Sequence, residues 1–230
     1  MIDEKREYIE RIQNIRQELI EAYGMPISRD PLPPVDELVS TILSQNTNDD
    51  NRDAAFQNLK SSFKDWEDVM NADTDAIIEA IRTAGLANQK GPRIQQALKD
   101  IADHNDGDIN LAFLRDLPKE QARHWLMERK GVGPKTVAIV LLFALGIPAF
   151  PVDTHIYRVT GRLGIRPKDL SVQKTHTYLE ERIPQDAFYD LHLNLIRLGR
   201  QVCGARKWQC YRCPVENLCE FKDKNLTPPE

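Results

Sequence analysis

Apolar residues recur at helical spacing along most of the chain, and no segment shows the strict alternation that is typical of a β-strand. An amphipathic helix is predicted over residues 3–23, where Gly24 ends it, and a stiff proline-rich connector follows from Pro26 to Pro34. The pattern therefore predicts an all-α protein. Further helices are predicted over about 35–44, 94–101, 156–163 and 186–202, and from Asp73 to Gly85. One more helix is expected to run through Leu59 and another to start at Ser171.

Residues 118–147 read as two helices that are joined by the turn Gly131-Val132-Gly133. Pro118 suits the first position of one helix, and Gly131 can end that helix at positive φ because it has no Cβ. Pro134 suits the first position of the next helix. From Val137 to Leu145 every residue is apolar, so we expect this second helix to be buried on all sides.

Three features around this turn carry candidate chemistry. A helix N-terminus has unpaired N–H groups and partial positive charge, and glycines let a phosphate approach them, so the turn predicts a phosphate clamp. Lys135 lies next to the clamp, and Asp153 is predicted to be the N-cap of a further helix. Each feature alone also has an ordinary interpretation: a tight turn, a solvated lysine and a simple helix cap.

Together these residues resemble a known pattern. Gly131-Val132-Gly133-Pro134-Lys135-Thr136, followed 18 residues after Lys135 by Val152-Asp153-Thr154-His155, resembles the helix-hairpin-helix DNA glycosylase superfamily, and most of all its endonuclease III branch. The resemblance implies a two-lobed all-α fold with Lys135 and Asp153 on opposite walls of a cleft. It implies a central bundle over about residues 29–148, with the hairpin at 118–147, and a second lobe made of residues 1–28 and 149–230.

The cysteines form the second strong signal. All four lie in one segment with the spacing Cys203-x6-Cys210-x2-Cys213-x5-Cys219. Such a cluster argues for metal rather than disulfides, and four thiolates suit either zinc or an iron–sulfur cluster. The same order of cysteines is found in the cluster loop of the endonuclease III branch. The resemblance therefore favours a [4Fe-4S] cluster held by the loop 203–219.

Charge and composition add the expected partner. The 230 residues carry a net charge of −4, which is unusual for a nucleic-acid-binding protein. Basic residues are nevertheless concentrated at the hairpin, on the segment with Arg158, Arg162 and Arg166, and in the cysteine loop, where Arg206 and Lys207 lie between ligands. Double-stranded DNA with damaged bases or abasic sites is the expected partner. The chain has no apolar run of membrane-spanning length and no signal-peptide pattern, so we expect an intracellular monomer.

Two loop residues match positions that touch DNA in the resembled family. Asn46 lies in Leu43-Ser44-Gln45-Asn46-Thr47-Asn48-Asp49, which is similar to the loop that fills the hole left by a flipped nucleotide. The family often has a longer glutamine there, and helix capping alone also explains these polar residues. Leu86 matches the apolar wedge that kinks the duplex, although a leucine in a polar loop is usually a packing residue.

The resemblance implies a base-excision-repair DNA glycosylase with apurinic/apyrimidinic lyase activity, in which Lys135 attacks C1′ and Asp153 stabilises positive charge on the sugar. Oxidised pyrimidines are the expected lesions. Relatives that act on mismatched thymine or uracil share the hairpin and the cysteines, so that alternative stays open. A DNA-binding module without catalysis and a cluster-bearing redox protein are the alternatives from other classes. The presence of both Lys135 and Asp153 argues against the first, and the phosphate clamp argues against the second.

Overall fold

The computed structural model describes residues 2–27 and 30–229. Within this part of the chain every regular element is helical, apart from one isolated antiparallel bridge between Cys203 and Trp208, so the all-α prediction is confirmed. No helix among these residues is long and apolar enough to cross a membrane. The chain divides into two compact units. We call Pro31–Ile147 the central unit, and Met1–Asp30 with Pro148–Glu230 the terminal unit.

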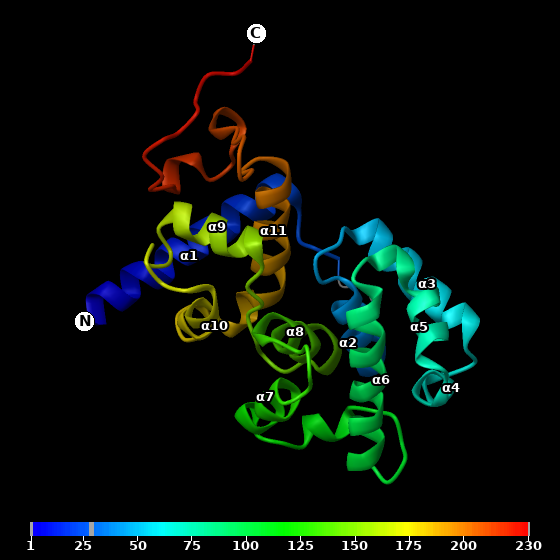
Figure 1. The fold of residues 1–230 in the computed structure, drawn as a ribbon. Coiled ribbons are helices and arrows are strands. Elements are labelled where there is room, and N and C mark those ends of the chain that lie inside the picture. The colour runs from blue at the N-terminus through cyan, green and yellow to red at the C-terminus, as the bar shows by residue number, and fades with distance from the viewer. Residues whose placement is uncertain (1, 28–29, 230) are drawn as a thin grey trace. The chain divides into compact units, whose positions relative to one another are not determined.

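The central unit is organised around its longest helix, α6 (Ala87–His104), which packs against α2 (Pro34–Leu43), α4 (Trp66–Asn71) and α5 (Thr74–Ala80) (Figure 1). Asn48, Asp65 and Asp73 cap three of its helices through their side-chain oxygens. The six-residue helix α4 was not predicted, because so short a segment shows no periodicity. The other elements of this unit are α2 (Pro34–Leu43), α3 (Asp49–Ser62), α4 (Trp66–Asn71), α5 (Thr74–Ala80), η1 (Arg82–Ala84), η2 (Ala112–Arg115), α7 (Lys119–Met127), α8 (Pro134–Ile139) and η3 (Val140–Leu145).

The hairpin in the central unit differs from its prediction in three details. Pro118 caps α7 instead of occupying its first turn, and α7 ends before the turn that reaches Gly131, whose φ is +83°. The second helix begins at Pro134 as expected but continues from α8 into the π-helical segment η3. The prediction that it is buried on all sides was wrong. Ile139, at the end of α8, stays partly accessible. The wider π-helical turn then shifts the phase of the side chains that follow, and Leu142 and Phe143 stay partly accessible as well.

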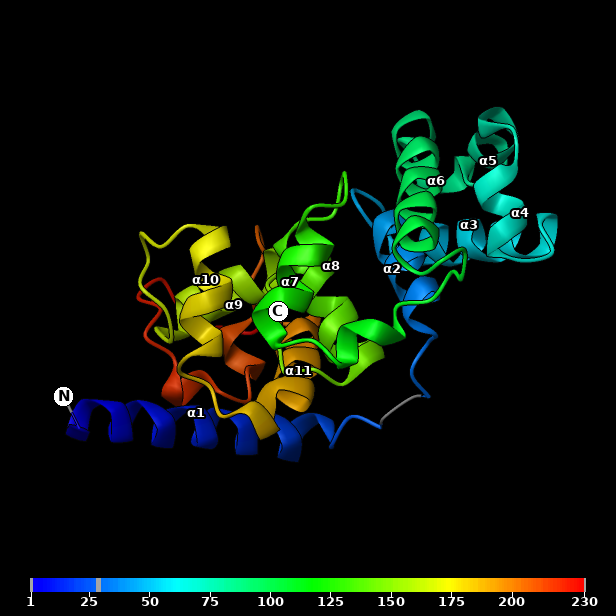
Figure 2. The ribbon, with the colours of Figure 1, turned by 90° about the horizontal axis from the view of Figure 1, so that it is seen from below.

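The terminal unit joins the two ends of the chain. Its helix α11 (Phe188–Gln201) contacts both α1 (Ile2–Tyr23) and α9 (Thr154–Leu163), as Figure 2 shows, and α10 (Val172–Glu180) completes its main helices. Gly199 of α11 permits the close approach to α9, since a Cβ there would lie 2.9 Å from Cβ of His155. The short helices of this unit are η4 (Gln185–Ala187), η5 (Cys210–Arg212) and η6 (Glu216–Leu218).

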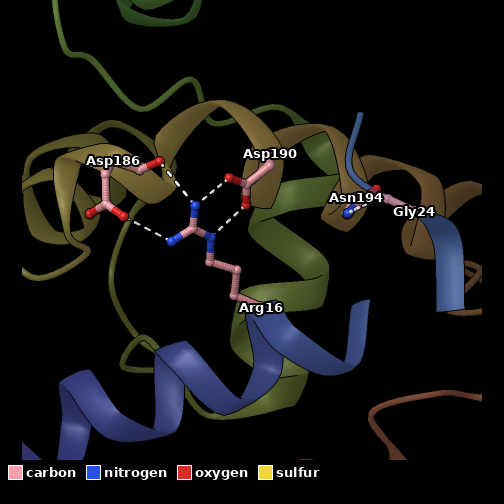
Figure 3. A network of polar contacts seen from close by, with 5 residues as sticks. All are labelled: Arg16, Gly24, Asp186, Asp190 and Asn194. Carbon is pink, nitrogen blue, oxygen red and sulfur yellow. Dashed lines mark hydrogen bonds and ion pairs between the residues drawn. The ribbon is translucent and has the colours of Figure 1, made fainter. Parts of the chain in front are cut away.

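Arg16 ties α1 to the C-terminal half of the terminal unit (Figure 3). Its Nε and Nη2 donate to the two carboxylate oxygens of Asp190 at 2.8 and 2.6 Å, and its Nη1 donates to Asp186 at 2.8 Å. Asn194 of α11 adds a second link through its amide, which donates to the carbonyl of Gly24 at 3.3 Å. The first helix of the chain is therefore an integral part of the unit that carries Asp153.

Candidate active site and nucleic-acid interface

The hairpin turn has one anchored residue between two accessible glycines. Val132 is 5% exposed and its N–H donates to the carbonyl of Arg129 at 3.0 Å, so this residue fixes the turn to the helical core. Gly131 lies against the stem of Arg93, because a Cβ on Gly131 would be only 2.5 Å from Cδ of Arg93. Gly133 is the N-cap of α8 and has open space where a Cβ would stand. A phosphate can therefore approach the backbone at this point.

Lys135 lies in the first turn of α8, two residues after the N-cap Gly133, and its side chain is half-buried. The next two residues, Thr136 and Val137, are buried, which holds this turn in place. Lys135 therefore combines partial access to solvent with a backbone that two buried neighbours anchor.

Asp153 is the N-cap of α9, as predicted. One carboxylate oxygen accepts from the N–H of Ile156 at 2.7 Å, and its carbonyl accepts from the N–H of Tyr157 at 2.9 Å. Two residues further on, burial lowers the pKa of His155, and Arg158 lies 3.0 Å from Nδ1 of that imidazole. Since the guanidinium can only donate, His155 accepts through Nδ1. Asp153 therefore presents a carboxylate whose position is fixed by the helix that it caps.

Asn46 and Leu86 share an unusual conformation. Both are exposed residues with left-handed backbones, at φ +54° for Asn46 and φ +51° for Leu86. Leucine adopts this conformation rarely, because its Cβ approaches the following carbonyl oxygen. Leu86 is nevertheless 47% exposed, so it is not a residue buried by loop packing. Strain of this kind is most often found at functional positions.

Two residues of the central unit that the sequence analysis did not select are tied to these loops. Gln45 donates through its amide to the carbonyl of Gly131 in the hairpin at 2.9 Å. Lys90 is 1% exposed, and its Nζ donates to the carbonyls of Leu43 and Ala84. A signal for Lys90 was present, because it lies four residues before Ile94 on the apolar stripe of its helix.

The four cysteines line one cavity of the terminal unit. Its walls also include Arg162, Trp208 and Phe221. The two rings pack edge to face at 5.6 Å, and the guanidinium of Arg162 contacts both, 4.8 and 4.7 Å from their centroids. Arg162 also donates to Sγ of Cys203 at 3.2 Å. Among the described residues no three Cys, His, Asp or Glu side chains converge on one ion position. Burial raises the pKa of the Cys213 thiol to about 12, so a ligand of positive charge is needed to hold it as a thiolate.

The arginines of the α9 segment have hydrogen-bond partners within the terminal unit. Arg158 donates to the carbonyls of Cys203 and Gly199 at 2.9 Å, and Arg162 donates to the carbonyl of Gly204 at 2.8 Å. Arg166 is buried and stacks on the ring of Tyr157. These guanidinium groups hold the cysteine loop and its surroundings, so part of the basic charge counted on this segment is already hydrogen-bonded within the terminal unit. Arg206 and Lys207 are exposed, as a phosphate-binding face requires.

The chain is similar to characterised DNA repair proteins. Residues 39–185 match the family model of the HhH-GPD superfamily base excision DNA repair proteins. Endonuclease III of Sulfolobus acidocaldarius is 33% identical over 191 residues, which are 82% of this chain and 82% of the relative. A putative DNA glycosylase of Arabidopsis thaliana is 39% identical over 75% of this chain, which spans 59% of that relative.

A solved structure agrees with these relatives. The structure of a trapped endonuclease III–DNA covalent intermediate is 28% identical, with a TM-score of 0.78, and the match covers 92% of this chain and 95% of that one. The similarity therefore extends across both units and not only across the hairpin. The chain belongs to the HhH-GPD superfamily of base excision DNA repair proteins, in its endonuclease III branch, and is a DNA-binding enzyme of the DNA glycosylase/AP lyase class.

Proposed function

We propose that this enzyme removes an oxidised pyrimidine from double-stranded DNA, with Lys135 as the nucleophile and Asp153 as the group that stabilises positive charge on the sugar. The observation that carries the proposal is the place of Lys135, half-buried in the first turn of the helix that follows the Gly131–Gly133 clamp. The neutral amine of Lys135 attacks C1′ of the extruded nucleotide. The glycosidic bond breaks, and the base leaves with the bonding electrons and takes up a proton.

The covalent product then cleaves the strand. The amine nitrogen loses its proton, the sugar ring opens and a Schiff base forms between Nζ of Lys135 and C1′. Loss of a proton from C2′ moves an electron pair towards C3′, and the 3′ phosphate leaves by β-elimination. Asp153 acts in the first step, where positive charge grows on the sugar. The covalent intermediate named for the endonuclease III structure supports this route.

We assign the DNA contacts to three places on the chain. In the central unit, the hairpin residues Gly131, Val132 and Gly133 bind a DNA phosphate through the backbone. In the terminal unit, the exposed side chains of Arg206 and Lys207 bind further DNA phosphates. The exposed left-handed loop residues, Asn46 and Leu86, enter the base stack, where Asn46 fills the vacated position and Leu86 acts as the wedge. The enzyme acts as a monomer in this proposal.

The cysteine loop fits a [4Fe-4S] cluster held by Cys203, Cys210, Cys213 and Cys219. All four line the same cavity of the terminal unit, four thiolates are the ligand set of such a cluster, and their spacing matches the cluster loop of the endonuclease III branch. The cluster would supply positive charge that keeps the buried thiols ionised. With its four cysteines bound to the cluster, the loop would keep the shape in which Arg206 and Lys207 are exposed.

A borohydride trap on three duplexes tests nucleophile and substrate together, since borohydride reduces a Schiff base to a stable cross-link. We expect cross-linking to a duplex with thymine glycol and to one with an abasic site, and little to a duplex with a thymine mismatch. Preferred trapping on the thymine mismatch would favour the mismatch glycosylase alternative.

Lys135→Gln should abolish the cross-link, while Lys130→Gln, which changes an exposed lysine of the same turn, should keep it. Asp153→Asn should keep the helix cap and lose base excision by about 10²-fold or more, but keep trapping on the preformed abasic site. Undiminished trapping by Lys135→Gln would refute the nucleophile.

A further inference from the structure

Lys90 joins the ends of two helical segments in the central unit. It lies in the first turn of α6, and its Nζ donates to the carbonyl of Leu43 at 2.7 Å and to that of Ala84 at 2.9 Å. Leu43 is the last residue of α2 and Ala84 is the last residue of η1. Carbonyls at these positions have no partner within their own helix and favour a cation.

The two segments end where the loops with left-handed residues begin. Asn46 follows Leu43 by three residues, and Leu86 follows Ala84 by two. Asn46 is exposed and Leu86 is 47% exposed, so the packing of their side chains alone does not fix either residue. The bonds of Lys90 therefore fix the two loops at their starting points and with respect to each other.

The hairpin is connected to the same two loops and to α6. Gln45, the residue before Asn46, donates through its amide to the carbonyl of Gly131 at 2.9 Å. Arg93, one turn after Lys90 on α6, packs against Gly131 with its stem. The phosphate clamp, the loop with Asn46 and the loop with Leu86 are thus linked by side chains of the central unit alone.

A core position does not require a lysine. Burial of an ammonium group costs free energy, and burial lowers the pKa of Lys90, whereas an apolar side chain fills such a position without that cost. What a lysine adds at this position is its two hydrogen bonds, since only a donor can satisfy the carbonyls of Leu43 and Ala84 at once. Those carbonyls stand at the helix ends from which the two loops that we assign to the base stack begin.

We propose that Lys90 and Gln45 are positioning residues that hold Asn46 and Leu86 ready to enter the base stack at a fixed distance from the hairpin. The inference rests on the proposed function, because it concerns the residues that open the duplex. It assigns neither Lys90 nor Gln45 to the chemical steps. It predicts that changes at these two positions impair opening of the duplex more than they impair binding to it.

The test uses a duplex with a tetrahydrofuran abasic analogue, which cannot form a Schiff base, and a 2-aminopurine next to it. Insertion of side chains unstacks the 2-aminopurine and raises its fluorescence. Lys135→Gln should give the full fluorescence rise, so the assay does not depend on the nucleophile. If the unaltered protein gives no rise, the inference is overturned, whereas the borohydride experiment on Lys135 is unaffected.

The variants come in matched pairs. Lys90→Met keeps the length of the side chain and removes both donors, and Lys99→Met makes the same change at an exposed position of α6. Gln45→Met removes the bond to Gly131, and Gln96→Met makes that change at another exposed position of α6. We expect Lys90→Met and Gln45→Met to give less than about half of the fluorescence rise, with Kd changed less than about threefold because the phosphate contacts remain. The two controls should match the unaltered protein.

A double-mutant comparison separates positioning from a loss of stability. In the unaltered protein Leu86→Ala should lower the fluorescence rise, and in Lys90→Met it should lower it little further, because the wedge is already displaced. Independent effects, or full fluorescence in Lys90→Met and Gln45→Met, would overturn the proposal. If circular dichroism shows that Lys90→Met does not fold, Gln45→Met decides alone, since its side chain bonds at the surface.

Discussion

Replacing Arg16 with methionine tests how the terminal unit holds its first helix (Figure 3). Methionine keeps most of the apolar stem and removes the guanidinium that bonds Asp190 and Asp186. The two carboxylates differ greatly in burial, because the side chain of Asp190 is 6% exposed and that of Asp186 is 74% exposed. The substitution therefore leaves one charge in solvent and the other almost enclosed.

That difference sets the expected magnitude. An exposed ion pair such as Arg16–Asp186 contributes about 0–1 kcal/mol. Loss of the partner of a buried carboxylate costs about 3–5 kcal/mol, and the 23% exposure of Arg16 places Arg16→Met at the lower end, about 3 kcal/mol. For a chain of this length about 1 kcal/mol shifts Tm by roughly 2–4 °C, so we expect a fall of about 6–12 °C.

Urea denaturation followed by circular dichroism measures the free energy of unfolding. Asp186→Asn is the matched control and should cost less than about 1 kcal/mol. In the double variant Arg16→Met/Asp190→Leu an apolar pair replaces the ion pair, and most of the lost stability should return. A loss below about 1 kcal/mol in Arg16→Met, equal to that of Asp186→Asn, would refute the assignment of Asp190 as the dominant partner.

Two further predictions concern the cysteine loop and the buried lysine. Protein purified without oxygen should absorb broadly near ~400 nm and hold about four iron atoms, and Cys213→Ser should lose both, whereas colourless protein with bound zinc would contradict the cluster. Burial lowers the pKa of Lys90 in the folded state. Between this lowered pKa and the usual value of ~10.4, Lys90 is protonated in the unfolded state but largely neutral in the folded state, so the unfolded state binds more protons than the folded state. The stability of the unaltered protein relative to Lys90→Met should therefore increase with pH in that window, and a difference independent of pH from 7 to 10, measured in urea, would contradict it.

The sequence predicted most accurately those features that depend on neighbouring residues. Asp153 caps its helix as expected because the bond spans only three residues, and the hairpin turn follows from the positive φ available to Gly131. The π-helical continuation of α8 could not be predicted, because an all-apolar segment has no periodicity that fixes its phase.

Long-range partners were the main source of error. Arg158 and Arg162 were counted as surface charge, yet their hydrogen bonds go to residues more than 40 positions later in the chain. Lys90 was overlooked because its partner Leu43 lies 47 positions earlier. Charge in a sequence shows where a cation is, but only the fold shows whether it faces solvent or a carbonyl.

Leu86 connects the energetics of the free protein to the proposed reaction. A left-handed leucine costs about 1–2 kcal/mol. Full burial of a leucine returns about 1.5–3 kcal/mol, and at 47% exposure only about half of that is gained. The free protein thus gains almost nothing from this residue in this conformation. The uncovered half of the side chain can be covered only by another apolar surface, and a base stack is such a surface. Under the proposed function, insertion of Leu86 into the base stack offsets this strain, and the hydrogen bond from Lys90 to Ala84 holds the start of the loop in place in the free protein.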